Sequence, residues 1–77
     1  MARVVVKLYA SLRSYVGGAA SVEVDVEPGQ TIADVLKRLG VPAEQTRIIF
    51  VNNRTGSLSQ ALEGGERIGV FPAIGGG

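Results

Sequence analysis

The sequence predicts an α+β domain in which one amphipathic helix packs across one face of a mixed sheet of four or five strands. Three observations favour this class. Two stretches have a strand-like period, one stretch has helical spacing between clear start and stop signals, and β-branched residues return near the C-terminal end. With 77 residues, the chain is long enough for one small domain with one core and too short for two.

Two stretches in the first third have the period of two that is typical of half-buried strands. The first, Arg3–Tyr9, is rich in β-branched and aromatic residues and places Tyr9 on the face opposite Val4. The second, Ser21–Glu27, alternates strictly between valine and polar residues. Between them, Ser11–Val16 has the i, i+3, i+4 spacing of a short helical turn, which the following glycine pair would end.

The main helix is expected directly after the Pro-Gly turn that follows the second strand. Thr31 is its N-cap, and Asp34 stands three residues later, in the position of a capping box. Gly40 is the expected stop, because a glycine readily adopts the left-handed conformation that ends a helix. Apolar residues with i, i+3, i+4, i+7 spacing form the stripe that faces the core: Ile32, Val35, Leu36 and Leu39.

Two further strands are expected in the second half of the chain. Ile48–Val51 is a short apolar strand closed by the turn signal NNRTG, and Arg67–Phe71 is the last strand, ended by Pro72. Ser57–Leu62 is only weakly patterned. The resulting order of strand, short turn, strand, helix, strand, short element and strand fits a β-grasp, or ubiquitin-like, roll. A ferredoxin-like domain would need a second full helix, which the sequence does not indicate.

The composition argues against several classes of function. The chain has no cysteine and no histidine, so it offers no thiol nucleophile, no usual zinc ligand and no common general base. A net charge of +1 without a basic stripe favours neither nucleic acid nor an anionic membrane as a partner. No apolar run approaches the roughly 20 residues that span a bilayer. We therefore expect a soluble, cytoplasmic protein that is not itself an enzyme and binds no metal or cofactor.

The last stretch, FPAIGGG, is unusual for such a domain. We expect residues 1–72 to form the β-grasp domain and residues 73–77 to form a flexible, glycine-rich tail. One interpretation is an inert, frayed end. The other is that a tail without Cβ atoms lies extended in a narrow channel of another protein, where its terminal carboxylate is activated by ATP as an acyl-adenylate.

At these residues the sequence resembles the MoaD/ThiS family of ubiquitin-like sulfur carriers. The resemblance rests on the ending LEGGERIGVFPAIGGG, and the first segment VKLYASLRSYVGG is similar to the MoaD branch, the molybdopterin synthase small subunit. It implies that an E1-like adenylyltransferase, using ATP and magnesium, adenylates the terminal carboxylate and that a sulfur donor converts it to a thiocarboxylate. The carrier would then insert its tail into the molybdopterin synthase large subunit and donate the sulfur for molybdenum cofactor synthesis.

The resemblance also implies site residues. Gly77 would bear the activated carboxylate, behind the slim tail formed by Gly75 and Gly76. The family usually ends in two glycines, so a third would move the carboxylate about 3.5 Å further along an extended channel. Four residues fall where the family contacts its partners, three of them in an apolar patch and the fourth a docking arginine: Tyr9, Leu62, Phe71 and Arg13. From the residues alone, the three apolar side chains also suit ordinary core or isolated surface positions.

Three other functions remain open at this stage. The protein could carry sulfur for thiamine, cysteine or tungsten-cofactor synthesis, or it could be a ubiquitin-like modifier that is conjugated to lysines through the same terminus. The third is a β-grasp interaction module whose tail has no function. Removing Gly76 and Gly77 separates the last possibility from the others, because only the carrier and the modifier need the terminus.

Overall fold

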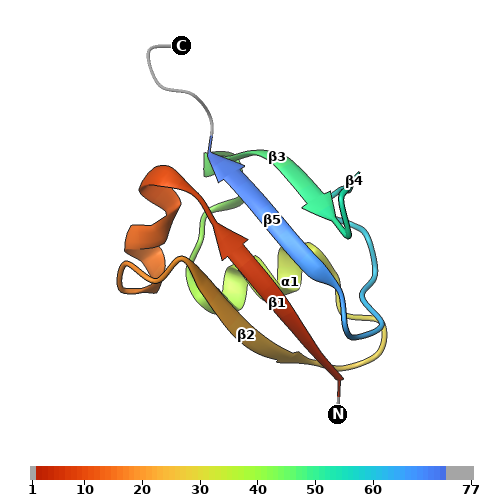
Figure 1. The fold of residues 1–77 in the computed structure, drawn as a ribbon. Helices are drawn as coiled ribbons and strands as arrows, with labels where there is room; N and C mark the ends of the chain where they lie inside the picture. Colours follow the sequence, from red (N-terminus) through yellow and green to blue (C-terminus); the bar gives the residue numbers. More distant parts are fainter. Residues whose placement is uncertain (1, 73–77) are drawn as a thin grey trace.

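The computed structural model describes residues 2–72, which form a five-stranded sheet with a helix across one face (Figure 1). The strands are β1 (Ala2–Leu8), β2 (Ser21–Val26), β3 (Thr46–Val51), β4 (Arg54–Thr55) and β5 (Arg67–Pro72). The helix is α1 (Ile32–Leu39), and two 3₁₀ segments are η1 (Ala10–Val16) and η2 (Ala43–Gln45). Within residues 2–72, no helix is long and apolar enough to cross a membrane.

The strands lie in the order β2-β1-β5-β3-β4. The first and last strands run parallel at the centre of the sheet, and every other pair of neighbours is antiparallel. The first and last strands of the domain therefore lie side by side, with the start of β1 and the end of β5 at opposite ends of the sheet (Figure 1). This topology confirms the β-grasp, ubiquitin-like roll, with five strands and one main helix.

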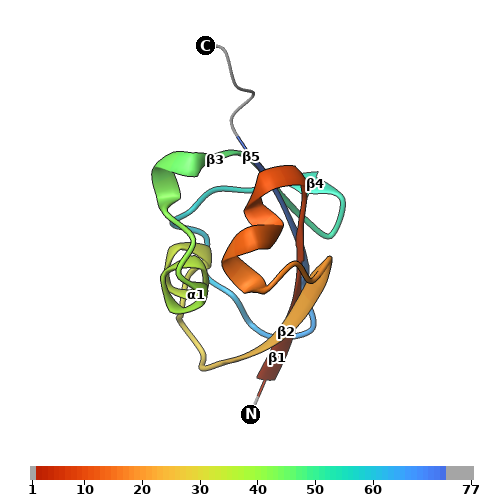
Figure 2. The ribbon, with the colours of Figure 1, turned by 90° about the vertical axis from the view of Figure 1, so that its left-hand side faces the viewer.

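The core lies between the sheet and the two helical segments α1 and η1, which are on the same side of the sheet in Figure 2. We call this side the inner face and the opposite side the outer face. Every second residue of the longer strands points into the core, as the period of two predicts. Buried strand residues on the inner face are Val4, Val6, Leu8, Val24, Val26, Ile49, Val51, Ile68 and Val70.

The helix α1 begins and ends as the sequence predicts. The Thr31 hydroxyl accepts a hydrogen bond from the Asp34 amide at 3.2 Å, and the Asp34 carboxylate accepts one from the Thr31 amide at 2.9 Å, which confirms the capping box. Gly40 has φ 81° and donates its amide to the carbonyl oxygens of Leu36 and Lys37. These contacts hold α1 across the inner face, where it buries three of its four predicted apolar residues.

The hairpin between β3 and β4 turns through two residues only. Asn52 and Asn53 have φ 52° and 69°, the left-handed conformation of a type I′ turn, which asparagine tolerates better than most residues. The Asn52 side-chain oxygen accepts a hydrogen bond from the Arg67 amide at 3.0 Å. The Asn52 amide in turn donates to the Arg67 carbonyl at 2.9 Å, so the turn anchors the start of β5.

The predicted boundaries differ from the observed ones by one or two residues at several ends. Tyr9 follows β1 instead of belonging to it, β3 begins at Thr46, and the turn signal NNRTG contributes the short strand β4. The Ser57–Leu62 stretch has no regular element and makes a single bridge, between Thr31 and Ala61. The predicted tail, residues 73–77, lies outside the described residues.

Candidate functional site

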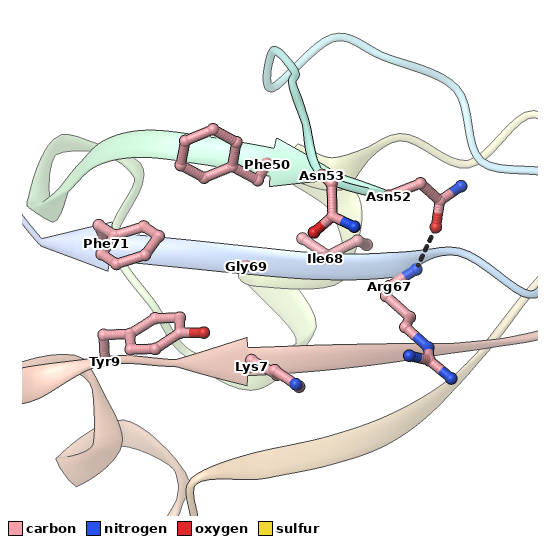
Figure 3. A pocket seen from close by; sticks show the side chains of 9 residues that line it. All are labelled: Lys7, Tyr9, Phe50, Asn52, Asn53, Arg67, Ile68, Gly69 and Phe71. Carbon is pink, nitrogen blue, oxygen red and sulfur yellow. Dashed lines mark hydrogen bonds between the residues drawn. The ribbon is translucent and has the colours of Figure 1, made fainter.

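Three aromatic side chains gather on the outer face of the sheet, and we call them the aromatic cluster: Tyr9, Phe50 and Phe71. The rings of Tyr9 and Phe71 are stacked with centroids 4.2 Å apart and planes 3° from parallel. Phe50 meets Phe71 edge to face at 5.7 Å. Figure 3 shows the three rings above β1, β5 and β3. Because no element covers this face in residues 2–72, the rings are only half-buried.

Strand register explains why the rings meet beside a hollow. Gly69 of β5 is paired with Lys7 of β1 on one side and with Phe50 of β3 on the other. A Cβ atom at Gly69 would lie 3.7 Å from the Tyr9 ring and 3.9 Å from the Phe71 ring, in ordinary contact. The glycine therefore leaves the floor of the hollow open, and the neighbouring rings form its wall (Figure 3).

Two depressions share the aromatic cluster. One, of about 420 Å³, is the polar hollow, and it is completed by Lys7, Asn52, Asn53, Arg67, Ile68 and Gly69. The other, of about 340 Å³, is the apolar groove, and it is completed by Ala10, Arg47, Ile48 and Pro72. In the groove, Ile48 is 44% exposed and lies beside the aromatic cluster, so the exposed apolar side chains are contiguous, as in a partner-binding patch. The outer face thus joins an apolar groove to a polar hollow beside the end of β5.

The charges along β1 and its two neighbouring strands fall into two groups. Arg3 on β1 forms ion pairs with Glu23 and Asp25 on β2, at 3.0 Å each. The hydrogen bond and charge of Asp25, followed by those of Glu23, raise the pKa of the Arg3 guanidinium. Lys7 and Arg67 are exposed and line the polar hollow, where no acidic residue lies. The acidic side chains of β2 are therefore bound by Arg3, whereas the hollow carries positive charge.

The turn before β5 is held by a carboxylate. Burial of Glu66 would by itself raise its pKa, but the backbone amides of Glu63 and Gly64 donate hydrogen bonds of 2.8 and 2.7 Å to it. The balance lowers the pKa of Glu66. Hydrogen bonds from the Thr31 amide and hydroxyl similarly lower the pKa of Asp34. In residues 2–72, no group of three or more histidine, cysteine, aspartate or glutamate side chains is placed to hold a metal ion.

Tyr9 and Phe71 are the predicted site residues that the structure brings together, since they stack on the outer face. The prediction that Leu62 belongs to an apolar surface patch is wrong, because its side chain is 1% exposed and belongs to the core. Its amide donates to the Gln30 carbonyl at 2.7 Å, which places the Leu62 segment beside the residues just before α1. Leu62 is therefore not part of a surface patch.

Arg13 is not among the residues that line the polar hollow or the apolar groove. It belongs to η1, on the side of the sheet that α1 covers, and its Nε donates to the Leu8 carbonyl at 3.1 Å. This bond fastens η1 to the end of β1, and a docking role for Arg13 stays a prediction. The tail residues Gly75, Gly76 and Gly77 lie outside the described residues.

Sequence reasoning missed several residues of this face. Phe50, Ile48, Lys7 and Arg67 were not singled out, although a signal existed in the apolar run IIFV. In a strand with one buried face, Ile48 and Phe50 take the opposite side from the buried Ile49 and Val51. Apolar residues on both sides of an uncovered strand indicate that the second side also contacts something.

Comparisons with known proteins agree with this fold. The Mut7-C ubiquitin family model matches residues 1–75. The chain belongs to this ubiquitin-like family. No curated protein matches the sequence.

Three solved structures are similar over nearly the whole chain. They are a putative molybdopterin converting factor subunit 1 from Pyrococcus furiosus (25% identity, TM-score 0.77, 96% of this chain and 100% of that chain), the small archaeal modifier protein 1 from Methanosarcina acetivorans (26%, 0.71, 100% and 98%) and a chain of the Amycolatopsis orientalis BexX/CysO complex (27%, 0.66, 96% and 99%). The resemblance to a ubiquitin-like family that includes MoaD is confirmed.

Proposed function

We propose that this protein is a ubiquitin-like sulfur carrier whose Gly77 carboxylate is the chemical group that it delivers. The observation that carries the proposal is the pairing of two features. A β-grasp domain presents an aromatic cluster on an uncovered sheet face, and its last strand ends at Pro72, beside that cluster and five residues before Gly77. A partner that docks on the face is therefore close to the point from which the tail departs.

The reaction is the one that the resemblance to sulfur carriers implies, and it suits a chain without histidine or cysteine. The E1-like adenylyltransferase would use ATP and magnesium to join the Gly77 carboxylate to AMP, with release of pyrophosphate. Sulfide from the sulfur donor then attacks the acyl carbon, AMP leaves, and a thiocarboxylate remains. With no histidine or cysteine, the chain supplies the carboxylate and the recognition surface, and its partners supply the catalytic groups.

Within this class, we place the protein as the small subunit of molybdopterin synthase. In that role the thiocarboxylate gives its sulfur to the pterin precursor inside the large subunit. The molybdopterin converting factor subunit 1 among the similar structures supports this assignment, as does the first segment VKLYASLRSYVGG. Sulfur delivery to thiamine, cysteine or tungsten-cofactor synthesis uses the same terminal chemistry and differs only in the partner that accepts the sulfur.

A ubiquitin-like modifier is the second candidate. The small archaeal modifier protein 1, 26% identical and matched over the whole chain, is the observation that favours it. A modifier would form an isopeptide bond between Gly77 and a lysine of another protein. The two functions share the adenylated intermediate and differ in the nucleophile that attacks it, which is sulfide for the carrier and an amine for the modifier.

Intact mass spectrometry tests the proposal. Protein purified from its own host is weighed, then incubated with the E1-like adenylyltransferase of that host, ATP, magnesium and sulfide, and weighed again. We expect a gain equal to the replacement of one oxygen by sulfur, located on Gly77 by fragmentation, and no gain in a variant without Gly76 and Gly77. The first mass also shows whether Gly77 ends the protein, as the proposal requires.

The outcome that rejects the carrier is an unchanged mass while the same enzyme preparation modifies a control carrier. Adducts of the intact chain on lysines of other proteins, without a thiocarboxylate form, would instead assign the protein to the modifiers.

A further inference from the structure

We propose that the polar hollow on the outer face binds the carboxylate of an aspartate or glutamate side chain of a partner protein, while an apolar neighbour of that residue fills the apolar groove. The inference deepens the proposed function. It rests on that function only in naming the adenylating enzyme as the partner. The hollow itself is a property of this chain and can be tested without that enzyme.

Strand register places two cations on the hollow. Lys7 and Gly69 are paired on the parallel strands β1 and β5, and Arg67 is paired with Val5 one step earlier. Lys7 and Arg67 therefore lie two residues apart on the same face, a diagonal that long side chains can span. In Figure 3 both side chains point over β1. A carboxylate that enters the hollow from the β1 side, beside the Gly69 floor, would meet both cations.

The opposite rim offers neutral donors. Asn53 lies in the turn between β3 and β4, and its side chain points over Ile68 in Figure 3. Its amide nitrogen can donate to a second carboxylate oxygen, because an ionised carboxylate accepts from several donors at once. A hollow of about 420 Å³ with polar donors along two of its sides has room for an acidic side chain of another protein.

The acidic residues that could neutralise the hollow are engaged elsewhere. Glu23 and Asp25 are bound by Arg3, and Glu66, which directly precedes Arg67, accepts hydrogen bonds from the amides of Glu63 and Gly64. Among residues 2–72, neither Lys7 nor Arg67 has a carboxylate within ion-pair distance. Two neighbouring cations without a counter-charge favour a bound anion, which relieves their mutual repulsion.

The neighbouring groove indicates that the anion belongs to a protein. The polar hollow shares Tyr9, Phe50 and Phe71 with the apolar groove, so both form one continuous surface. A free anion would leave the groove and the 44% exposed Ile48 in water. A protein segment with an acidic residue beside an apolar one covers both, with an apolar centre and a charged edge as in other protein interfaces.

The first test uses peptides and the full-length chain. The ¹⁵N-labelled protein is titrated with acetyl-Leu-Asp-Leu-amide and, as a matched neutral probe, with acetyl-Leu-Asn-Leu-amide. We expect the Asp peptide to shift the amide signals of Lys7, Gly69 and Asn53, and the Asn peptide to bind at least tenfold more weakly. A third titration with inorganic phosphate distinguishes a protein carboxylate from a small free anion.

Charge-reversal variants test whether peptide binding depends on Lys7 and Arg67. Lys7→Glu and Arg67→Glu should each weaken the Asp peptide at least tenfold, with Lys7→Gln and Arg67→Gln intermediate. Lys37→Glu is the matched control, because Lys37 is an exposed lysine on α1, which covers the inner face, and the same charge change there should leave binding unaltered. Circular dichroism confirms that each variant is folded.

The second test measures kcat/KM for adenylation of the full chain. Lys7→Glu and Arg67→Glu should lower it at least tenfold and reduce its dependence on salt, whereas Lys37→Glu should not. Equal binding of the Asp and Asn peptides, phosphate that binds the hollow as tightly as the Asp peptide, or shifts confined to other residues would overturn the inference. If the Asp peptide binds as expected but the wild-type chain is never adenylated, the proposed function fails and the carboxylate site stands.

Discussion

The two faces of the sheet show how one pattern of alternation produces both a fold and a recognition surface. The inner face consists of aliphatic side chains that α1 and η1 cover, and within residues 2–72 no polar side chain is buried. The outer face, uncovered by any described element, carries aromatic rings and the Gly69 hollow with the cations Lys7 and Arg67. Because successive strand residues point to opposite sides, Leu8 and Tyr9 are neighbours in sequence yet serve the core and the surface respectively.

The largest expected effect sharpens this contrast with two adjacent substitutions. Leu8→Ala removes a fully buried side chain and should lower the free energy of unfolding by about 2–5 kcal/mol. Tyr9→Ala removes a half-buried ring with one stacked partner and should cost only about 1 kcal/mol. Urea denaturation followed by circular dichroism measures both. Equal losses for the two variants would mean that the outer face also holds the fold together.

Gly64 lies beside the start of β1 and contributes a side chain to neither face of the sheet. Substituting it tests whether backbone packing outside the two faces also stabilises the fold. Gly64 has φ 118°, and a Cβ atom there would collide with the Cβ atom of Ala2 at the start of β1. Gly64→Ala should therefore destabilise the protein by about 2 kcal/mol, from a strained backbone and a displaced strand end. Gly65→Ala is the matched control, since φ there is also positive, at 83°, but a Cβ atom would meet no neighbour within 4 Å. Equal melting temperatures of the two variants in thermal denaturation would contradict the steric explanation.

The cap of α1 should have a smaller effect, although α1 covers much of the inner face. Thr31→Ala removes the hydroxyl that accepts from the Asp34 amide and should cost about 1 kcal/mol. Thr31→Ser keeps the hydroxyl and should remain close to the wild type. Urea midpoints at neutral pH compare the three proteins, and a Ser variant as weak as the Ala variant would show that the hydrogen bond is not the cause.

The smallest effect concerns pH. The folded pKa of Glu66 is lowered, so its stabilising contribution is present above the ordinary glutamate pKa of about 4.3 and is lost as the pH falls through the folded value. Glu66→Gln should remove that part of the loss, and its stability should change less than that of the wild type between pH 6 and pH 2. The lowered pKa of Asp34 contributes a loss of stability of the same sign to the wild type and to Glu66→Gln, so this contribution cancels when the two proteins are compared. Identical pH profiles of the urea midpoint would show that the turn does not depend on the charge.

Much of the fold was predictable because its signals are local. The valine alternation of β2, the capping box at Thr31 and Asp34, and the left-handed stop at Gly40 each depend on residues a few positions apart. The paired asparagines similarly specify a tight turn through their tolerance of positive φ. The stacking partners Tyr9 and Phe71 were found through a family resemblance, since 62 positions separate them in the chain.

The sequence by itself determined where the four longer strands and the helix lie to within two residues, and which side of β1 and β2 is aliphatic, because these follow from local spacing. Only the tertiary structure decided that Leu62 is core, since its burial depends on a hydrogen bond to Gln30, 32 positions away. The polar hollow likewise exists only when β1, β5 and β3 lie side by side, because register alone puts Lys7, Gly69 and Phe50 in one row. Contacts between distant segments have no local signature, so the site emerges only once the chain has folded.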